Sequence, residues 1–461
     1  YRKVIQAQTH YCNGVVLVFG LFYLFEIFFT WRLPMSNRRF FAICSFMLLL
    51  SLACSSCSTA KDTISSDVQS TPPTTASDST TLMDDSEPIS TASFVKAGNG
   101  PLVSLDSGIY EAQIVYENSC SIFYTDPIQQ KRIYLCGAPN CTHDNESCSA
   151  YFSTPGRTYP PMLLTNGKKI LLMFTEALEG SNPSMISIDL DGSNRQTVFE
   201  LASNQYVRGN FYISNDDIYF DVVQTDSDSS SHYQLWHANI ESKEAQEVAD
   251  LGSDEQFYYL CGCAGSRLCF ATIDSNSNIK YYLSTPQELN FDAPFYTDNS
   301  GHADSFVSNG FLYTISEEGE CVTRTNLISG EKRVTAFPIK EGYSDPAMQY
   351  AYDNNLLVTE GSPVVNGKFD VCAYYIDFDN DTATEISLRT PYNNRPVYVY
   401  ATVGDKLYVA TDYKTYTVKQ SFQDGGSENY EYIAYEYAFI SKKDYVNSND
   451  AGYEMVEDMF D

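Results

Sequence analysis

Short apolar runs separated by polar turns recur along most of this 461-residue chain. After residue 98, a pair of turn residues is followed within a few positions by a run of three or four strand-forming residues. The unit occurs seven times, and neighbouring units are 44 to 51 residues apart. Strand-forming runs that alternate with turn residues are typical of β-hairpins, and helical periodicity is almost absent here. The second turn residues of the seven units are Asn118, Gly167, Asp216, Gly265, Gly310, Asn354 and Asp405.

Several units contain a second strand–turn–strand pattern, at residues 185–199, 326–336 and 374–386. Two hairpins per unit give four antiparallel strands, which is the size of one propeller blade. Blades packed around an axis bury both faces of each sheet and leave only short edges. We therefore expect an all-β fold over residues 99–461, a β-propeller of about seven four-stranded blades, with six or eight as the alternative counts. A pair of β-sandwiches is the competing architecture, and the even spacing of the units argues against it.

The first 53 residues follow a different pattern. Met35 precedes two arginines and an uncharged apolar stretch, residues 40–53, and Cys54 follows that stretch directly. This stretch is too short to span a bilayer comfortably and suits the hydrophobic region of a signal peptide. Residues 35–53 are therefore expected to be an export signal, and residues 1–34 a spurious leader outside the real protein.

The end of the signal resembles the lipobox of bacterial lipoproteins, because small Ala53 precedes Cys54. In that family the cysteine is acylated and becomes the new N-terminus, so the resemblance implies lipidation at Cys54. Ser51 departs from the leucine usual there, Cys57 is the alternative acceptor, and an ordinary secretory signal cut after Ala53 is the competing interpretation. Lipidation would hold the protein stably on the outer face of the cell membrane.

Composition separates a tether from the repeats. Of the 41 residues 58–98, 17 are Ser or Thr, and no apolar periodicity is present, so residues 54–98 are expected to be a lipidated cysteine and a disordered tether. The whole chain carries 29 basic and 59 acidic residues, a net charge of −30. Nucleic acid is therefore a poor partner, because its binding requires a basic surface.

One constellation carries chemistry. Cys136, Cys141, His143 and Cys148 lie within 13 residues, where the other units have a plain turn. Three thiolates and an imidazole can surround Zn²⁺ tetrahedrally, and four protein ligands would make such a metal structural. A disulfide from Cys136 or Cys141 to Cys148 is an equal alternative, and a reduced loop without metal is the third.

Other candidate residues are expected to be structural. Cys261, Cys263 and Cys269 suit a buried strand–turn–strand. Asp377, Asp379 and Asp381 lack the Gly and Glu of a calcium loop. The tyrosines of residues 398–400 and 430–437 could stack on sugars, although alternating aromatic residues are usually strand packing.

The repeats, with motifs such as Ile188-Asp189-Leu190-Asp191-Gly192-Ser193-Asn194, resemble TolB-like and low-density-lipoprotein-receptor-like propellers. More particularly, they resemble the uncharacterised propeller lipoproteins of anaerobic Firmicutes, which implies a fold and a location and no settled activity.

Common hydrolase, metalloprotease and phosphate-loop motifs are missing, and no catalytic residue is predicted. We expect a non-catalytic propeller that binds a protein, a small ligand or a glycan. The alternative is an envelope enzyme, a glycan-active lyase or hydrolase with a site in the propeller funnel.

Overall fold

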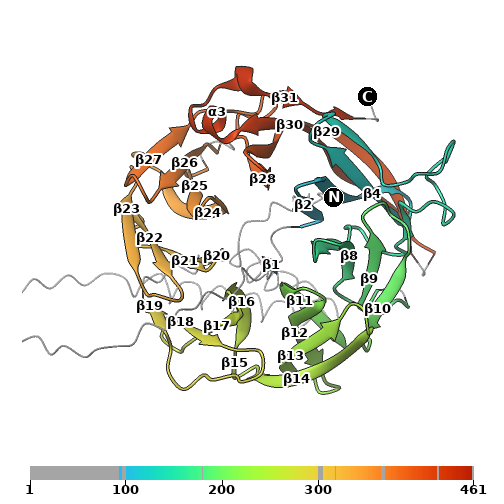
Figure 1. The fold of residues 1–461 in the computed structure, drawn as a ribbon, viewed down its shortest axis with the longest axis horizontal. Coiled ribbons are helices and arrows are strands. Elements are labelled where there is room, and N and C mark those ends of the chain that lie inside the picture. Colours follow the sequence, from blue (N-terminus) through green and yellow to red (C-terminus); the bar gives the residue numbers. More distant parts are fainter. Residues whose placement is uncertain are drawn as a thin grey trace, which may run out of the picture. The chain divides into compact units, whose positions relative to one another are not determined.

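Seven β-sheets stand around a central axis and form a β-propeller (Figure 1). The computed structural model describes residues 93–95 and 100–458, apart from 179, 300–304, 317, 365–368 and 423–424. Within each blade the strands follow the chain outward from the axis, and consecutive strands pair antiparallel. The expected all-β propeller with seven blades is confirmed; in the described part of the chain, five sheets have four strands, and those of blades 1 and 3 have six.

Blade 1 contains β2 (Leu102–Leu105), β3 (Gly108–Tyr116), β4 (Ser119–Asp126), β5 (Lys131–Tyr134) and β6 (Tyr151–Ser153). Blade 2 contains β7 (Met162–Thr165), β8 (Lys169–Phe174), β9 (Ser184–Asp189) and β10 (Gln196–Glu200). Blade 3 contains β11 (Gln205–Ser214), β12 (Asp217–Thr225), β13 (Ser231–Asn239), β14 (Glu244–Ser253) and β15 (Gln256–Phe257).

Blade 4 contains β16 (Tyr259–Ala264), β17 (Arg267–Ile273), β18 (Ile279–Ser284) and β19 (Tyr296–Asp298). Blade 5 contains β20 (Ser305–Ser308), β21 (Phe311–Ile315), β22 (Cys321–Asn326) and β23 (Lys332–Ala336). Blade 6 contains β24 (Ser344–Tyr352), β25 (Asn355–Gly361), β26 (Val371–Asp377) and β27 (Thr382–Ile386). Blade 7 contains β28 (Val399–Val403), β29 (Lys406–Ser421), β30 (Ser427–Ser441) and β31 (Glu454–Met455), with the helices α3 (Lys442–Val446) and η2 (Asp450–Gly452) before its last strand.

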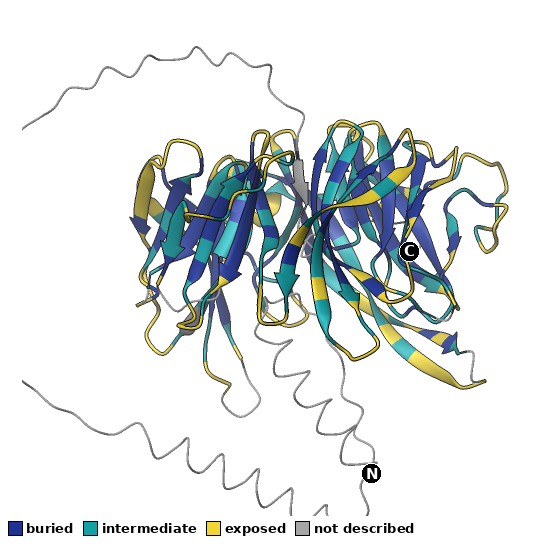
Figure 2. Cartoon of the chain, turned by 90° about the horizontal axis from the view of Figure 1, so that it is seen from below, coloured by how far each residue is buried: buried dark blue, intermediate teal, exposed yellow. Residues whose placement is uncertain are grey.

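The hydrophobic core lies between neighbouring blades. Phe211 and Phe220 of blade 3, for example, share a fully buried cluster with Leu171 of blade 2. Figure 2 shows the same arrangement, with buried strands inside and exposed turns at both ends of the blades. Burial of one such side chain contributes roughly 1.5–3 kcal/mol, so each blade depends on its neighbours for stability.

Six of the seven turns used to define the repeat join the first and second strands of a blade, but the first does not. Asn118 joins β3 to β4, the second and third strands of blade 1, while β2 and β3 are joined by residues 106–107. Asn118 adopts a left-handed conformation (φ 54°) close to that of Asn215 (φ 56°) and Asn309 (φ 50°). The same left-handed asparagine therefore occurs in the turn between the first and second strands of a blade and in the turn between the second and third. For this reason the sequence pattern placed the first unit one hairpin too late in its blade.

Short strands extend the regular pattern in blades 1 and 3, and two of them come from the two ends of the described chain. β1 (Ser93–Val95), which the sequence analysis placed in the tether, pairs with β11 on the inner edge of blade 3. β32 (Glu457–Asp458) pairs in parallel with β5 on the outer edge of blade 1, so the end of the chain joins the first blade and closes the ring.

The long hairpin β29–β30 also crosses from blade 7 to blade 1, as Figure 1 shows. The Tyr416 hydroxyl donates to the carbonyl of Ile114, and the backbone N–H of Asn118 donates to Gln420 Oε1 at 2.8 Å.

The predicted leader, signal peptide, Cys54 and most of the tether lie outside the described residues. Among the residues that are described, no helix is long and apolar enough to cross a membrane.

Candidate metal centre

The four candidate ligands lie in an interruption of the outer strand of blade 1. β5 and β6 both pair antiparallel with β4, one after the other along the same edge. At the junction, the carbonyl of Ile122 accepts from the Leu135 N–H, and the Ile122 N–H donates to the Ala150 carbonyl, both at 2.9 Å. The outer strand is therefore one strand with residues 136–149 inserted at its middle. In Figure 1 this insertion is the teal excursion on the rim near β4.

Local turn chemistry folds the insertion back on itself. Asn140 and His143 both adopt φ 58°, a left-handed conformation that asparagine and histidine tolerate better than bulky residues. The Asn145 side chain accepts from the Ser147 N–H at 3.1 Å, and the Asn145 carbonyl accepts from the Cys148 N–H at 3.0 Å. These turns direct the ligand side chains toward one point.

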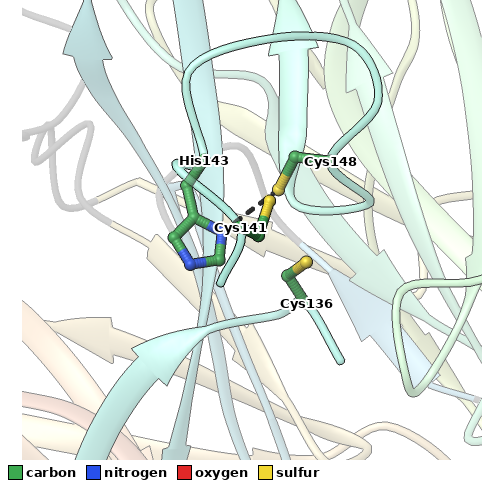
Figure 3. Close-up of side chains that lie close together, drawn as sticks. All are labelled: Cys136, Cys141, His143 and Cys148. Atoms are coloured by element: carbon green, nitrogen blue, oxygen red, sulfur yellow. Dashed lines mark hydrogen bonds between the residues drawn. The ribbon is translucent and has the colours of Figure 1, made fainter. Parts of the chain in front are cut away.

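The ligand atoms converge. The three Sγ atoms and the imidazole nitrogen all lie within 4.8 Å of one another, and His143 Nδ1 is 3.2 Å from Cys148 Sγ (Figure 3). Tetrahedral zinc with bonds of about 2.0–2.3 Å requires ligand atoms roughly 3.5–3.8 Å apart. Cys136, Cys141 and Cys148 are free thiols in this arrangement. The cluster of Cys136, Cys141, His143 and Cys148 could therefore hold a metal ion such as zinc.

The surroundings distinguish the thiols. Cys148 is 1% exposed, and burial raises the pKa of its thiol to about 12. Burial also opposes ionisation of Cys136, but hydrogen bonds from the Ala138 backbone and the Ser149 side chain bring its pKa below the ordinary value. Burial lowers the pKa of His143, which favours the neutral imidazole that a metal requires. The ring of Tyr134 stacks on that imidazole at 4.2 Å and fixes its orientation.

Blade 2 supports the base of the insertion. The Arg195 guanidinium donates to the carbonyls of Ser149 and Tyr151, at 3.1 and 2.6 Å, and lies 3.7 Å from the ring of Phe152. Gly192 (φ +85°) approaches so closely that a Cβ there would lie 2.5 Å from the Leu135 carbonyl oxygen. The turn between β9 and β10, at the end of the motif of residues 188–194, thus packs against the base of the insertion.

The donor set defines the chemistry that a metal would have here. Three cysteines and one histidine fill a tetrahedral shell and leave no position for water or substrate, which is typical of structural zinc. These four residues are neighbours in space, as their short spacing in the sequence predicts. The spacing alone does not decide between metal and disulfide, because that choice depends on the directions of the side chains.

The other cysteines and aspartates considered as candidates do not form a second ligand cluster in the described part of the chain. Cys261 Sγ lies 3.5 Å from Cys269 Sγ, and Cys263 is buried in another cluster. Asp379 pairs with Arg324 and Arg333, so it serves a contact between blades 5 and 6.

The remaining histidines also have structural partners where they are described. His232 lies 3.1 Å from Asp226, and His237 lies 2.8 Å from Asp217. His302 lies outside the described residues.

Two features of the structure are not evident from the sequence. The first is the buried pair of Glu111 and Arg132, 2.9 Å apart, which joins strands β3 and β5. The second is Tyr392, which is 67% exposed and packs against Tyr413 with ring centroids 4.4 Å apart. Residues 391–396 contain two prolines and two asparagines, and this turn signal could have marked an ordered loop.

No family model matches the chain, and no curated protein matches it. The solved structures similar to it include a prolyl endopeptidase (10% identity, 76% of this chain, 47% of that chain, TM-score 0.43). An uncharacterized protein of Listeria monocytogenes EGD-e is also similar (11% identity, 73% and 94% covered, TM-score 0.40). So is the WD40 domain of SCAP from fission yeast (10% identity, 76% and 96% covered, TM-score 0.34).

The chain spans about half the length of the prolyl endopeptidase. At these identities and scores, the similarities carry no argument about activity.

Proposed function

We propose that this protein is an extracytoplasmic lipoprotein, anchored through Cys54, whose propeller binds a protein or a glycan without catalysis. In this proposal it belongs with the propeller lipoproteins of anaerobic Firmicutes that its repeats resemble. The tether of residues 54–98 spaces the propeller from the outer face of the cell membrane, and a structural zinc holds the insertion of blade 1.

The observation that carries the binding role is a line of aromatic side chains, Tyr392, Tyr413, Tyr435 and Tyr400, which we call the tyrosine row. Ring centroids are 4.4 Å apart between the first two, 6.4 Å between the next two and 5.4 Å between the last two. The row runs from inner strand β28 to the exposed Tyr392. Exposed tyrosines with rigid support are typical of contact sites for proteins and sugars.

Tyr392 is held in place before any ligand arrives. Its loop is closed by the Thr390 N–H, which donates to the Arg395 carbonyl at 2.8 Å, and by the Asn394 N–H, which donates to the Thr390 carbonyl at 2.9 Å. The guanidinium of Arg395 lies 5.6 Å from the ring of Phe369, itself 44% exposed. Because the loop is already ordered, binding there would cost little conformational entropy.

The buried carboxyls favour packing over catalysis. Glu111 is held by Arg132, and Glu360 accepts from the hydroxyl of Tyr374 at 2.9 Å. Asp221 is 1% exposed and lies 3.8 Å from Arg208. None of these three groups presents a carboxyl that a substrate could contact, so the enzyme alternative draws no support from them.

The anchor and the binding face require separate tests. Metabolic labelling with a clickable fatty acid should mark the wild-type protein and not the Cys54→Ser variant. An unlabelled wild type would contradict the anchor and leave the binding role standing.

For the binding face, the wild type, Tyr392→Ala and Tyr159→Ala should be compared on a glycan array and in cross-linked capture from envelope. Tyr159 is 38% exposed and lies outside the tyrosine row, so it is a matched control. We expect a ligand that the wild type and Tyr159→Ala retain and Tyr392→Ala loses. A ligand retained equally by all three would contradict the assignment of the tyrosine row.

Zinc requires its own measurement. Protein purified without chelator should contain one zinc per chain. A metal-free protein whose mass is two hydrogen atoms lower than that of the reduced chain would indicate a disulfide instead.

A further inference from the structure

The strand that leads into the candidate metal centre is also the strand on which the ring closes. β5 pairs with β4 along one edge, and β32 pairs with β5 along the other through Glu457 opposite Lys131 and Asp458 opposite Arg132. The Glu457 N–H donates to the Gln130 carbonyl at 2.7 Å. β5 has only four residues, so its position determines whether β32 can pair.

The closure is built around a buried cation. Arg132 is 1% exposed, and its guanidinium donates to Asp458 Oδ2 and Glu111 Oε2, both at 2.9 Å. The Tyr437 hydroxyl of blade 7 donates to the other oxygen of Glu111 at 3.0 Å. Arg132 therefore joins the first blade, the last strand and, through Glu111, the seventh blade.

The candidate metal ligands come shortly after Arg132 in the chain. Cys136 is four residues after Arg132, and Tyr134, which ends β5, stacks on the imidazole of His143. On the far side of the insertion, the backbone returns at Ala150 to the same residue of β4, Ile122, that holds Leu135. The insertion is thus joined to the end of β5 both along the chain and through the contact between His143 and Tyr134.

We propose that metal binding at Cys136, Cys141, His143 and Cys148 is thermodynamically coupled to docking of β32 on β5. A bound metal holds the insertion in one conformation and keeps β5 aligned with both of its neighbours. Without the metal, the 14-residue insertion gains conformational freedom, and β5 loses the fixed end that presents Lys131 and Arg132 to the last strand. The metal centre then stabilises closure of the whole ring, beyond its own loop. This inference rests on the metal site of the proposed function and is independent of lipidation and of any ligand.

The first test follows hydrogen exchange. Full-length protein loaded with zinc and the same protein stripped by a chelator should be compared by mass spectrometry, with attention to residues 450–458. We expect amide exchange at Glu457 to rise about tenfold or more on stripping, within the range usual for coupled sites. Exchange in β21 and β22, on the far side of the ring, should stay unchanged. Equal exchange at Glu457 in the loaded and stripped proteins would overturn the coupling.

The second test runs in the opposite direction, because coupling between two sites is reciprocal. Asp458→Asn weakens the closure without touching a metal ligand, so its zinc affinity, measured against a chromophoric chelator, should fall, by at most the factor by which stripping of zinc raises exchange at Glu457. Asp450→Asn, an exposed acid eight residues earlier, removes the same charge and should bind zinc as the wild type does. An unchanged affinity in Asp458→Asn would also overturn the inference.

The outcomes are distinguishable from failure of the proposed metal site. If the wild type binds no zinc, the metal assignment fails, and the coupling fails with it. If zinc binds stoichiometrically and closure does not respond, the coupling alone is wrong. Both tests use the folded full-length chain, so neither depends on a cysteine variant that fails to fold.

Discussion

Blades 1 and 3 are the two six-stranded sheets of the propeller, and each contains a buried acid beside an arginine. In blade 1, Glu111 and Arg132 lie 2.9 Å apart, and Asp458 and Tyr437 complete the hydrogen bonds. In blade 3, Asp221 and Arg208 are 3.8 Å apart, and the guanidinium lies among the rings of Tyr233, Phe257 and Tyr259.

The difference shows how the position of an added strand changes the environment of a buried charge. β32 brings a second carboxylate to Arg132 and closes the ring, whereas β1 pairs with β11 on the inner edge of blade 3, far from the outer strands. Burial raises the pKa of Asp221 to about 6, with Arg208 opposing the shift. The charges of blade 1 thus serve connection between blades, while Asp221 costs stability when it is ionised.

The largest effect is expected from breaking the charge cluster of blade 1. Arg132→Met leaves Glu111 and Asp458 without their cation, and the free energy of unfolding should fall by about 3–5 kcal/mol. Chemical denaturation measures it, with Arg208→Met in blade 3 as the comparison. A loss in Arg208→Met equal to that in Arg132→Met would contradict the contrast between the two blades.

The raised pKa of Asp221 predicts that the free energy of unfolding depends on pH, with an effect of similar size. Its pKa is about 6 in the folded protein and 3.8 in the unfolded chain, so the stability from its protonated form is full below pH 3.8 and is lost as pH rises through 6. Between pH 4 and 8 this costs the wild type up to about 3 kcal/mol, which Asp221→Asn does not lose. The free energy of unfolding of Asp221→Asn should therefore increase relative to that of the wild type as pH rises. Chemical denaturation at a series of pH values and fixed ionic strength measures it. Asp381→Asn, at an exposed position, is the control and should track the wild type.

Loss of a metal ligand is expected to destabilise blade 1 and, through the pairing of β5 with β32, the closure of the ring. Cys148→Ser should abolish stoichiometric zinc and lower stability by about 3 kcal/mol when zinc is at a hundredfold excess over its dissociation constant. Cys321→Ser in blade 5 is the matched control and should keep both zinc and stability. A stable Cys148→Ser variant that retains zinc would remove this residue from the ligand set.

A smaller effect is expected where blade 2 supports the insertion. Gly192→Ala forces a Cβ toward the Leu135 carbonyl at a positive φ, and should cost about 1–3 kcal/mol. Gly330→Ala, at a similar φ with open space around its Cβ position, tests the conformational part alone. The excess loss in Gly192→Ala, measured as a difference in denaturation midpoint, reports the contact with blade 1. Equal losses would show that the contact contributes nothing.

The smallest effect on stability is expected at Tyr392, outside both blades. Tyr392→Ala should change the free energy of unfolding by less than about 0.5 kcal/mol, because the side chain is largely exposed. A large loss of stability in the same denaturation measurement would mean that the tyrosine row is packing and not a binding surface.

The regular blades were predictable because their signals are local. Turn residues such as Asn309-Gly310 and the strand-forming runs after them report backbone preferences within a few residues, and seven copies make the pattern countable. Blade 1 was misread where local chemistry is ambiguous, since Asn118 has the turn conformation expected of a different hairpin.

The sequence by itself determined the all-β repeat, a count of about seven blades and the proximity of Cys136, Cys141, His143 and Cys148, because these follow from composition and short spacing. Only the tertiary structure decided that the insertion divides an outer strand, that Arg195 and Gly192 support it, and that Asp458 meets Arg132 across 326 residues. Contacts between residues so far apart depend on how complete blades pack around the axis. No pattern within a single repeat encodes that packing.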